Sequence, residues 1–516
     1  MIPFDASGAF QSGTGDHELR RLAVRGAAAT VSAAALALGV QMISTVILAR
    51  LLTPSDFGVV TMVTTFSLLL ASFGLNGFMD AVIQFEEIDQ YTASNFFWLN
   101  AGAGLLLAIG FTAAGSLLAR FYRNPLVANV ATGLSVGIFI AAVSVMHQAL
   151  LKRAMRFTGT SANDVIGRAA NTAVSILLAL RGWGYWALVA GIIAQQLSVM
   201  IGAWWLCRWV PSWPRRTGKT GTAVRFAAKV YGRFCLGYST QNIDNLLVGW
   251  RFNAVALGFY KKAYDLFALS GSQLIAPLHN VALASLSKLN RDPVRFRRYL
   301  ANSLGIIAFA GMAVSADLTL VGKDVVRLVL GPQWSESSRI FELFGPGIVV
   351  MLLCGAIGWI HLSLGNPGLW FRWSLVELGL TVSLFLVALH WGPEGIAAAW
   401  SVSYWTLLIP GFWYAGRPIG FGASALIGAV WRYAAAALIA GLMSAAIIRG
   451  TPFWGPPSSA SAALWAIIII SALLVTLYLG LVIIFHRGLA PLRQVAGLLR
   501  ELAPSQKGTT PAAEAV

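Results

Sequence analysis

Charged residues are scarce in this chain of 516 residues. Asp, Glu, Lys and Arg together make up 11% of it, whereas 57% is hydrophobic. A soluble domain carries roughly a quarter charged residues, and it could not hide this much apolar surface. The mean hydropathy of +0.71 points the same way. The composition therefore excludes an ordinary soluble protein and predicts an integral membrane protein.

Cysteine is also rare. Cys207, Cys235 and Cys354 are far apart, and none belongs to a CxxC pair. A disulfide framework or a zinc site is therefore not expected, and we predict neither a metal nor a cofactor. The first 18 residues are polar and acidic, without the basic start and short apolar core of a cleaved signal peptide. We expect the first membrane helix itself to direct insertion.

Enzyme motifs are missing as well. The sequence contains no HExxH and no GxSxG. The letters TGKT at 217–220 resemble the end of a phosphate-binding loop, but the first glycine of that motif would fall on Trp213. The loops predicted outside the membrane are too short to hold a catalytic domain. We therefore predict that the chain is not an enzyme.

Long apolar runs dominate what is present. A spanning helix needs roughly 20 mostly apolar residues, and about fourteen segments meet this requirement. The seventh and eighth are the most polar. The predicted fold is an all-α polytopic membrane protein with spans at 27–48, 58–80, 95–118, 126–149, 164–181, 184–206, 234–252, 256–281, 299–320, 339–363, 369–389, 395–415, 425–447 and 462–485.

Basic residues fall mainly on one side of these spans. If the N-terminus is cytoplasmic, most of the net charge of +17 lies in cytoplasmic loops, as the positive-inside rule requires. This distribution accounts for the charge without nucleic acid. It predicts an even number of spans with both termini in the cytoplasm. The cytoplasmic set includes Arg20, Arg21, Lys152, Arg153, Arg291, Arg297, Arg298, Arg432, Arg487 and Arg493.

The two halves of the chain resemble each other. Gly58 in ARLLTPSDFGVVTM aligns with Gly258 in GWRFNAVALGFYKK at an offset of 200 residues. Pro125 then aligns with Pro332 at an offset of 207, and the segment from 182 aligns with that from 392 at 210. Three matches in the same order indicate a duplication of six spans. An even number gives parallel repeats with a substrate path between them.

This repeat predicts the domain organisation. Two six-span lobes would be followed by two extra C-terminal helices. We expect the tails 1–18 and 503–516 to be disordered and 486–502 to form a basic amphipathic helix. The predicted parts are a cytoplasmic N-terminal tail (1–25), an N-lobe (26–208), a basic linker (209–232), a C-lobe (233–416), spans 13 and 14 (417–485) and a cytoplasmic C-terminal tail (486–516).

Charged residues inside spans mark candidate sites, because a charge at a helix centre costs about 2.5–3.5 kcal/mol on insertion scales. In the eighth span, Lys262 and Asp265 share one helix face, and Lys261 is spaced to pair with Asp265. The seventh span carries Asp244. The further candidates for lining a cavity are Gln241 and Asn245 in the seventh span and Asn76 and Asp80 in the second.

A structural reading of these charges stays open. Lys261 and Arg251 lie near the outer ends of their spans, so both side chains could extend to the membrane interface. Glu377 is the one carboxylate in the predicted eleventh span, and either a structural partner or a coupling proton would explain it.

Several longer stretches then indicate a family. ILARLLTPSDFGVVTMVTTF, SLLARFYRNP, NIDNLLVGWRFNAVALGFYKKAYDLFAL and VRLVLGPQWSE occur in this order. They resemble the Wzx-like oligosaccharide flippases of the multidrug/oligosaccharidyl-lipid/polysaccharide exporter superfamily, over about residues 25–415. The family motif N-x-D-N-L-L-I-G matches Asn242, Asp244, Asn245 and Gly249, and its basic residue before A-Y matches Lys262. The family often has Gly-Arg here, whereas Trp250 separates Gly249 from Arg251.

The resemblance implies a function. Such proteins move undecaprenyl-diphosphate-linked oligosaccharides across the bacterial inner membrane for exopolysaccharide, capsule or O-antigen assembly. It also implies alternating access by two six-helix lobes, membrane lipids as surroundings, and a polysaccharide polymerase and chain-length regulator as partners. Lysine suits a diphosphate, so we predict that Lys262, with Lys261, binds it. A cation-coupled multidrug exporter of the same superfamily is the alternative, although a cationic drug favours a carboxylate-rich cavity.

Overall fold

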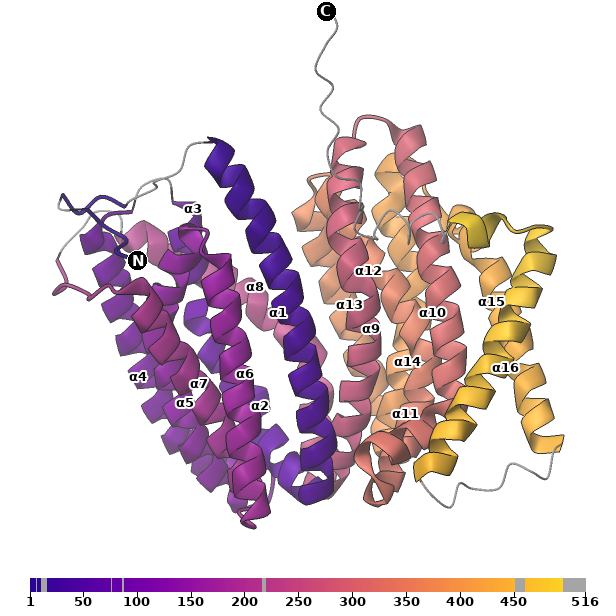
Figure 1. Cartoon of the computed structure of the whole chain (residues 1–516), viewed down its shortest axis with the longest axis horizontal. Coiled ribbons are helices and arrows are strands. Elements are labelled where there is room, and N and C mark those ends of the chain that lie inside the picture. The colour runs from indigo at the N-terminus through magenta and orange to yellow at the C-terminus, as the bar shows by residue number, and fades with distance from the viewer. Residues whose placement is uncertain are drawn as a thin grey trace, which may run out of the picture. The chain divides into compact units, whose positions relative to one another are not determined.

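The computed structural model describes residues 1–5, 7–10, 16–75, 77–85, 88–215, 220–450 and 460–494 (Figure 1). Almost all of these residues are helical, because backbone groups in lipid must satisfy their hydrogen bonds within the chain. The α-helices are α1 (Asp16–Leu51), α2 (Pro54–Leu75), α3 (Phe78–Gln84), α4 (Gln90–Phe121), α5 (Leu126–Arg153), α6 (Phe157–Leu180), α7 (Tyr185–Cys207), α8 (Thr220–Arg251), α9 (Ala254–Lys288), α10 (Pro293–Leu330), α11 (Ser335–Phe344), α12 (Ile348–Ser363), α13 (Pro367–Ala388), α14 (Gly392–Gly416), α15 (Ala423–Gly450) and α16 (Ala460–His486).

The predicted all-α membrane fold is confirmed, because each predicted span coincides with a helix or a broken pair of helices. The second span breaks into α2 and α3, and the tenth into α11 and α12. Ten segments of the described chain are long and apolar enough to cross a membrane. Helices α6, α8 and α9 fall outside these ten segments. For α8 and α9 this agrees with their polar sequences.

Two compact units make up the chain. The first contains Met1–Lys262, Val329–Ser337 and Phe385–Ile396, and the second contains Ala263–Leu328, Ser338–Leu384 and Ala397–Val516. This division follows packing and lies beyond the predicted linker 209–232. Part of that linker is helical, because α8 already begins at Thr220. The division into two six-span lobes therefore stays a prediction from the sequence repeat.

In the first unit, α5 packs against α2, α4 and α7, and α6 packs against α1 and α7. One end of this bundle is covered by residues 1–5 and 7–10, which belong to the tail that we expected to be disordered. Phe4 is buried and lies 6.0 Å from Trp209 between ring centroids. Backbone N–H of Gln90 donates to the carbonyl of Gly8. The polar composition of this segment concealed two aromatic anchors, Phe4 and Phe10, which hold it on the bundle.

In the second unit, α10, α15 and α16 lie side by side (Figure 1). The hydroxyl of Tyr478 in α16 donates to the carbonyl of Phe309 in α10 at 2.8 Å. About two turns earlier in α16, the hydroxyl of Ser471 donates to the carboxylate of Asp317 at 3.0 Å. In a membrane the lipid is as apolar as the helix side chains, so the hydrophobic effect does not hold helices together. Hydrogen bonds between helices, such as these two, contribute instead.

Candidate functional site

Two turns in the first unit have the same form at the offset of 200 residues. Helix α1 ends at Leu51 and α2 begins at Pro54, and correspondingly α8 ends at Arg251 and α9 begins at Ala254. Thr53 caps α2 by accepting a hydrogen bond from the backbone N–H of Asp56. At the second turn, the side chain of Asn253 accepts from the backbone N–H of Ala256. The structure thus repeats where the sequence aligns.

The starts of α2 and α9 cross at these turns through two glycines. A Cβ at Gly58 would overlap the carbonyl oxygen of Ala254 and lie 3.0 Å from its Cα. A Cβ at Gly258 would overlap the carbonyl oxygen of Pro54 and lie 3.1 Å from its Cα. Because ordinary carbon–carbon contacts are about 3.5–4.0 Å, only glycine permits this approach. Each repeat therefore supplies the glycine that the start of the other repeat's helix contacts.

A buried tryptophan closes the same end of the first unit. Trp334 has no exposed side-chain area, and its indole N–H donates to the carbonyl of Ala49 at 2.8 Å. Its ring meets the edges of Phe57 and Phe259 at centroid distances of 5.6 and 5.8 Å. Sequence reasoning missed this residue. The one signal for it was its position two residues after the aligned Pro332.

Lys262 lies beneath this crossing. Only 8% of its surface is exposed, and its ammonium nitrogen lies 3.9 Å from the ring centroid of Phe57. A cation this close to an aromatic face is attracted by the ring quadrupole. Phe57 belongs to the first turn of α2, so the predicted lysine of the second repeat contacts the crossing helix of the first.

Asp244 is fully buried on the adjoining helix, α8. Its carboxylate accepts hydrogen bonds from the hydroxyl of Tyr260 and from the backbone N–H of Asn245, both at 2.8 Å. Asn245 is 1% exposed, and its amide nitrogen donates to the side chain of Asn242 at 3.3 Å. Asp244, Asn245 and Asn242 of α8 therefore form one hydrogen-bonded cluster with Tyr260 of α9.

The cluster is deep in the helices. With a rise of about 1.5 Å per residue, Asp244 lies roughly 10 Å from the end of α8 at Arg251. Lys262 lies roughly 12 Å from the start of α9 at Ala254. Arg251 itself is exposed, as expected for a side chain that extends to the interface. Ionisable groups at such depth are candidates for a functional site in a membrane protein.

The other predicted site residues do not all lie near this cluster. Lys261 is half-buried beside Lys262, and Gln241 is exposed on α8. Asp265 lies one turn further along α9, where the chain has entered the second unit. Asn76 lies outside the described residues. No group of three His, Cys, Asp or Glu side chains that could hold a metal occurs in the described part of the chain.

Asp80 is remote from the cluster. It is half-buried in the first turn of α3, beyond the far end of α2. The Lys262 contact is at Phe57, and about 27 Å of α2 separates Phe57 from the helix end at Leu75. The sequence placed Asp80 with the other candidates because it lies in a predicted span, but that pattern carries no information on depth.

Several known proteins are similar to this chain in sequence. Residues 47–339 match the model of the family described as polysaccharide biosynthesis protein. The succinoglycan biosynthesis transport protein ExoT of Rhizobium meliloti is 21% identical over 66% of this chain and 69% of its own. The lipopolysaccharide biosynthesis protein WzxC of Escherichia coli is 20% identical over 68% of this chain and 69% of its own.

Solved structures share the fold. The lipid II flippase MurJ in an inward closed conformation aligns with a TM-score of 0.70, at 14% identity, over 90% of this chain and 99% of its own. An inward-facing multidrug transporter of the MATE family aligns at 0.60, with 13% identity, over 75% of this chain and 95% of its own. At these identities the likeness concerns the fold alone. The family match covers more than half of the residues, and the chain therefore belongs to the polysaccharide biosynthesis protein family, the Wzx-like membrane transporters.

Proposed function

We propose that this protein moves undecaprenyl-diphosphate-linked oligosaccharide repeat units across the bacterial inner membrane for the assembly of surface polysaccharide. The observation that carries the proposal is the burial of two ionisable side chains of opposite sign, Lys262 and Asp244, in a member of this family. Such a substrate combines a diphosphate, a sugar head and a lipid tail. Its polar part cannot cross hydrocarbon unless protein groups replace the lost hydration.

Lys262 would bind the diphosphate. Lysine carries a compact charge with three rotatable donors, and a charged donor forms strong hydrogen bonds with phosphate oxygens. Its contact with the face of Phe57 keeps the charge stabilised while no anion is bound. Lys261, half-buried at the next position, would be a second donor for the same group.

Asp244 would hold the site in shape. The hydroxyl of Tyr260 joins α9 to this carboxylate on α8, and the backbone N–H of Asn245 donates to it from within α8. A buried carboxylate is costly unless it has such partners. Asp244 or Asp265 would balance the lysines in the empty site or take up a coupling cation.

Alternating access would follow from movement at the glycine crossing. Lys262 is shielded where α2 crosses α9, so an anion reaches it from this end once the two helix starts separate. The outer gate in this proposal consists of Gly58, Gly258 and the indole of Trp334 above them. The proposed orientation has both termini in the cytoplasm, so the crossing faces the periplasm.

The first experiment compares cells with and without the gene. Lipid-linked oligosaccharide on each leaflet would be quantified by its accessibility to an external sugar-modifying reagent. We expect accumulation on the inner leaflet and loss of surface polysaccharide in the deletion strain. A normal leaflet distribution, in a strain without a second such transporter, would contradict the proposal. Increased sensitivity to cationic drugs would then favour the multidrug exporter.

A point substitution tests the role of Lys262. Lys262→Gln keeps much of the length of the side chain and removes the charge, so we expect export to be lost while the protein remains in the membrane. The matched control is Lys323→Gln, which removes an exposed lysine that pairs with Glu342 at 3.1 Å. Normal export by Lys262→Gln would refute the diphosphate role.

A polysaccharide polymerase and a chain-length regulator are proposed partners, since each exported repeat unit needs a polymerising system on the outer side. Co-purification of the tagged full chain with membrane proteins of the same cells tests this proposal. Recovery of the transporter without either partner after gentle crosslinking would argue against it.

A further inference from the structure

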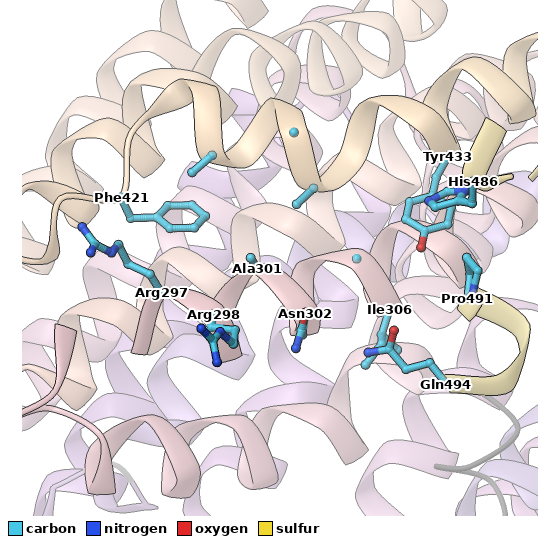
Figure 2. A pocket seen from close by; sticks show the side chains of 14 residues that line it. Arg297, Arg298, Ala301, Asn302, Ile306, Phe421, Tyr433, His486, Pro491 and Gln494 are labelled. Atoms are coloured by element: carbon cyan, nitrogen blue, oxygen red, sulfur yellow. The ribbon is translucent and has the colours of Figure 1, made fainter. Parts of the chain in front are cut away.

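A second polar site lies in the second unit, apart from the cluster around Lys262. It is a cavity of about 490 Å³ between α10, α15 and the end of α16 (Figure 2). Small residues open the space, because a Cβ at Gly428 would meet nothing within 4 Å, and one at Gly305 would meet Tyr433 only at 3.9 Å. The polar and aromatic side chains that line it include Arg297, Arg298, Asn302, Phe421, Tyr433 and His486.

Positive charge characterises one end of this cavity. Arg297 and Arg298 lie near Phe421, in the first two turns of α10 (Figure 2). A side chain at Gly420 would place its Cβ 3.0 Å from a guanidinium nitrogen of Arg297, so this glycine leaves room for the arginine. No Asp or Glu is among the described residues that line the cavity. Asp292, the acidic residue closest in sequence, pairs with Arg295 instead.

The other end of the cavity is lined by the hydroxyl of Tyr433. Tyr433 is only 8% exposed, and its ring stacks near His486 at 4.8 Å between centroids. Within the described chain its hydroxyl has no hydrogen-bond partner, and in Figure 2 it points into the cavity. The hydroxyl lines the cavity, so it is available to donate to a ligand that supplies an acceptor. Asn302 adds an amide between the two ends.

We propose that this cavity binds an anionic glycerophospholipid of the inner leaflet. The planar guanidinium of an arginine binds phosphate oxygens through two parallel N–H bonds. Basic pockets between membrane helices on the cytoplasmic side are suited to such headgroups. The ester carbonyls, deeper than the phosphate, are acceptors for the hydroxyl of Tyr433. One acyl chain follows the small and apolar surface of Ala425, Ala429 and Ile306.

The location favours a lipid over a soluble anion. All three helices are among the segments apolar enough to span a membrane. The chain around this cavity carries Arg297, Arg298, Arg432, Arg487 and Arg493, which the positive-inside rule places in the cytoplasm. A soluble phosphate would use the arginines alone and leave the apolar part of the cavity without a role.

Native mass spectrometry of the purified full chain tests the proposal. Phosphatidylglycerol is titrated against phosphatidylethanolamine with the same acyl chains, and glycerol phosphate is the soluble probe. We expect tight binding of phosphatidylglycerol alone. The double variant Arg297→Gln and Arg298→Gln should bind it roughly 30-fold more weakly, since each basic residue near an anionic surface contributes about a fivefold effect. The matched control removes two exposed arginines of the first unit, Arg120→Gln and Arg181→Gln, and should bind normally.

A steric variant keeps the test decisive if the charge variant does not fold. Gly428→Leu fills the cavity without changing charge, and Gly441→Leu is its control, because a Cβ there also meets nothing within 4 Å. Loss of phosphatidylglycerol binding in Gly428→Leu, with normal binding in Gly441→Leu, supports the site. Equal binding of both phospholipids, binding of glycerol phosphate at similar affinity, displacement by undecaprenyl diphosphate, or unchanged binding in both cavity variants would overturn it.

Discussion

The glycine crossing gives the sharpest prediction. In Gly58→Ala the new Cβ would lie 2.5 Å from the carbonyl carbon of Ala254, and in Gly258→Ala it would lie 2.7 Å from that of Pro54. Ordinary contacts are about 3.5–4.0 Å, so the helix starts must move apart by roughly 1 Å or more. Neither clash can be relieved by a rotamer, because both involve backbone atoms.

We therefore expect either single alanine to stop export while the protein still accumulates in the membrane. Overpacking costs about 1–3 kcal/mol. The folded protein can tolerate this cost, but the two helix starts can no longer reach the close contact of the closed gate. The assay for opening is labelling of Leu257→Cys, a fully buried position of α9, by a membrane-impermeant maleimide. The background lacks the native cysteines, and labelling should rise in each alanine variant.

The control variant is Gly102→Ala in α4, where a Cβ meets nothing within 4 Å. Alanine is favoured over glycine inside a helix by about 1 kcal/mol, so this variant should export normally. The reasoning is refuted if Gly58→Ala and Gly258→Ala export at the normal rate with unchanged labelling. It is equally refuted if Gly102→Ala fails to the same extent, because the loss would then not depend on the crossing.

Three further predictions concern stability and pH. Tyr260→Phe removes a donor from buried Asp244 and should lower the free energy of unfolding by about 1–3 kcal/mol; an unchanged denaturation midpoint would show that other groups fully replace the hydroxyl. Trp334→Ala empties a fully buried position and should cost about 3–5 kcal/mol, whereas Trp391→Ala, at an exposed position, should leave thermal unfolding unchanged. Hydrogen bonds from Ser7 and Ala9 hold the pKa of Asp5 below its ordinary value, so the carboxylate stabilises the N-terminal turn above pH of about 4. That contribution should vanish as the pH falls through the lowered pKa, and the ¹⁹F resonance of fluorophenylalanine at position 4 would report it; a pH response that persists in Asp5→Asn would assign it to another group.

Much of the fold follows from hydropathy alone. Spanning helices are long apolar runs, and lipid leaves them no alternative hydrogen-bonding pattern. The repeat was also readable, because the match of Gly58 with Gly258 marks a contact that only glycine permits. Short elements were less accessible. Helix α3 overlaps the end of the second predicted span and α11 the start of the tenth, and hydropathy has no signal for a break within an apolar run.

The candidate site was predictable in chemistry and not in geometry. A buried lysine and a buried aspartate are expensive in lipid, so the charges of Lys262 and Asp244 are conspicuous within their apolar runs. Periodicity gives the face of one helix and says nothing about the helix opposite. It could therefore not reveal that Lys262 contacts Phe57, or that Tyr260 donates to Asp244. For the same reason it grouped Asp80 with residues about one helix length away.

The reciprocal form of the crossing has a consequence for the origin of the chain. Pro54 contacts Gly258 while Ala254 contacts Gly58. Pro54 is equivalent to Ala254, and Gly58 to Gly258, at the offset of 200 residues. Contacts in which residue i meets j and j meets i are those of an isologous dimer interface. We infer that a six-span ancestor associated with a second copy through this contact before its gene was duplicated and fused. Expressed as separate fragments cut between α7 and α8, the two halves should still assemble and export.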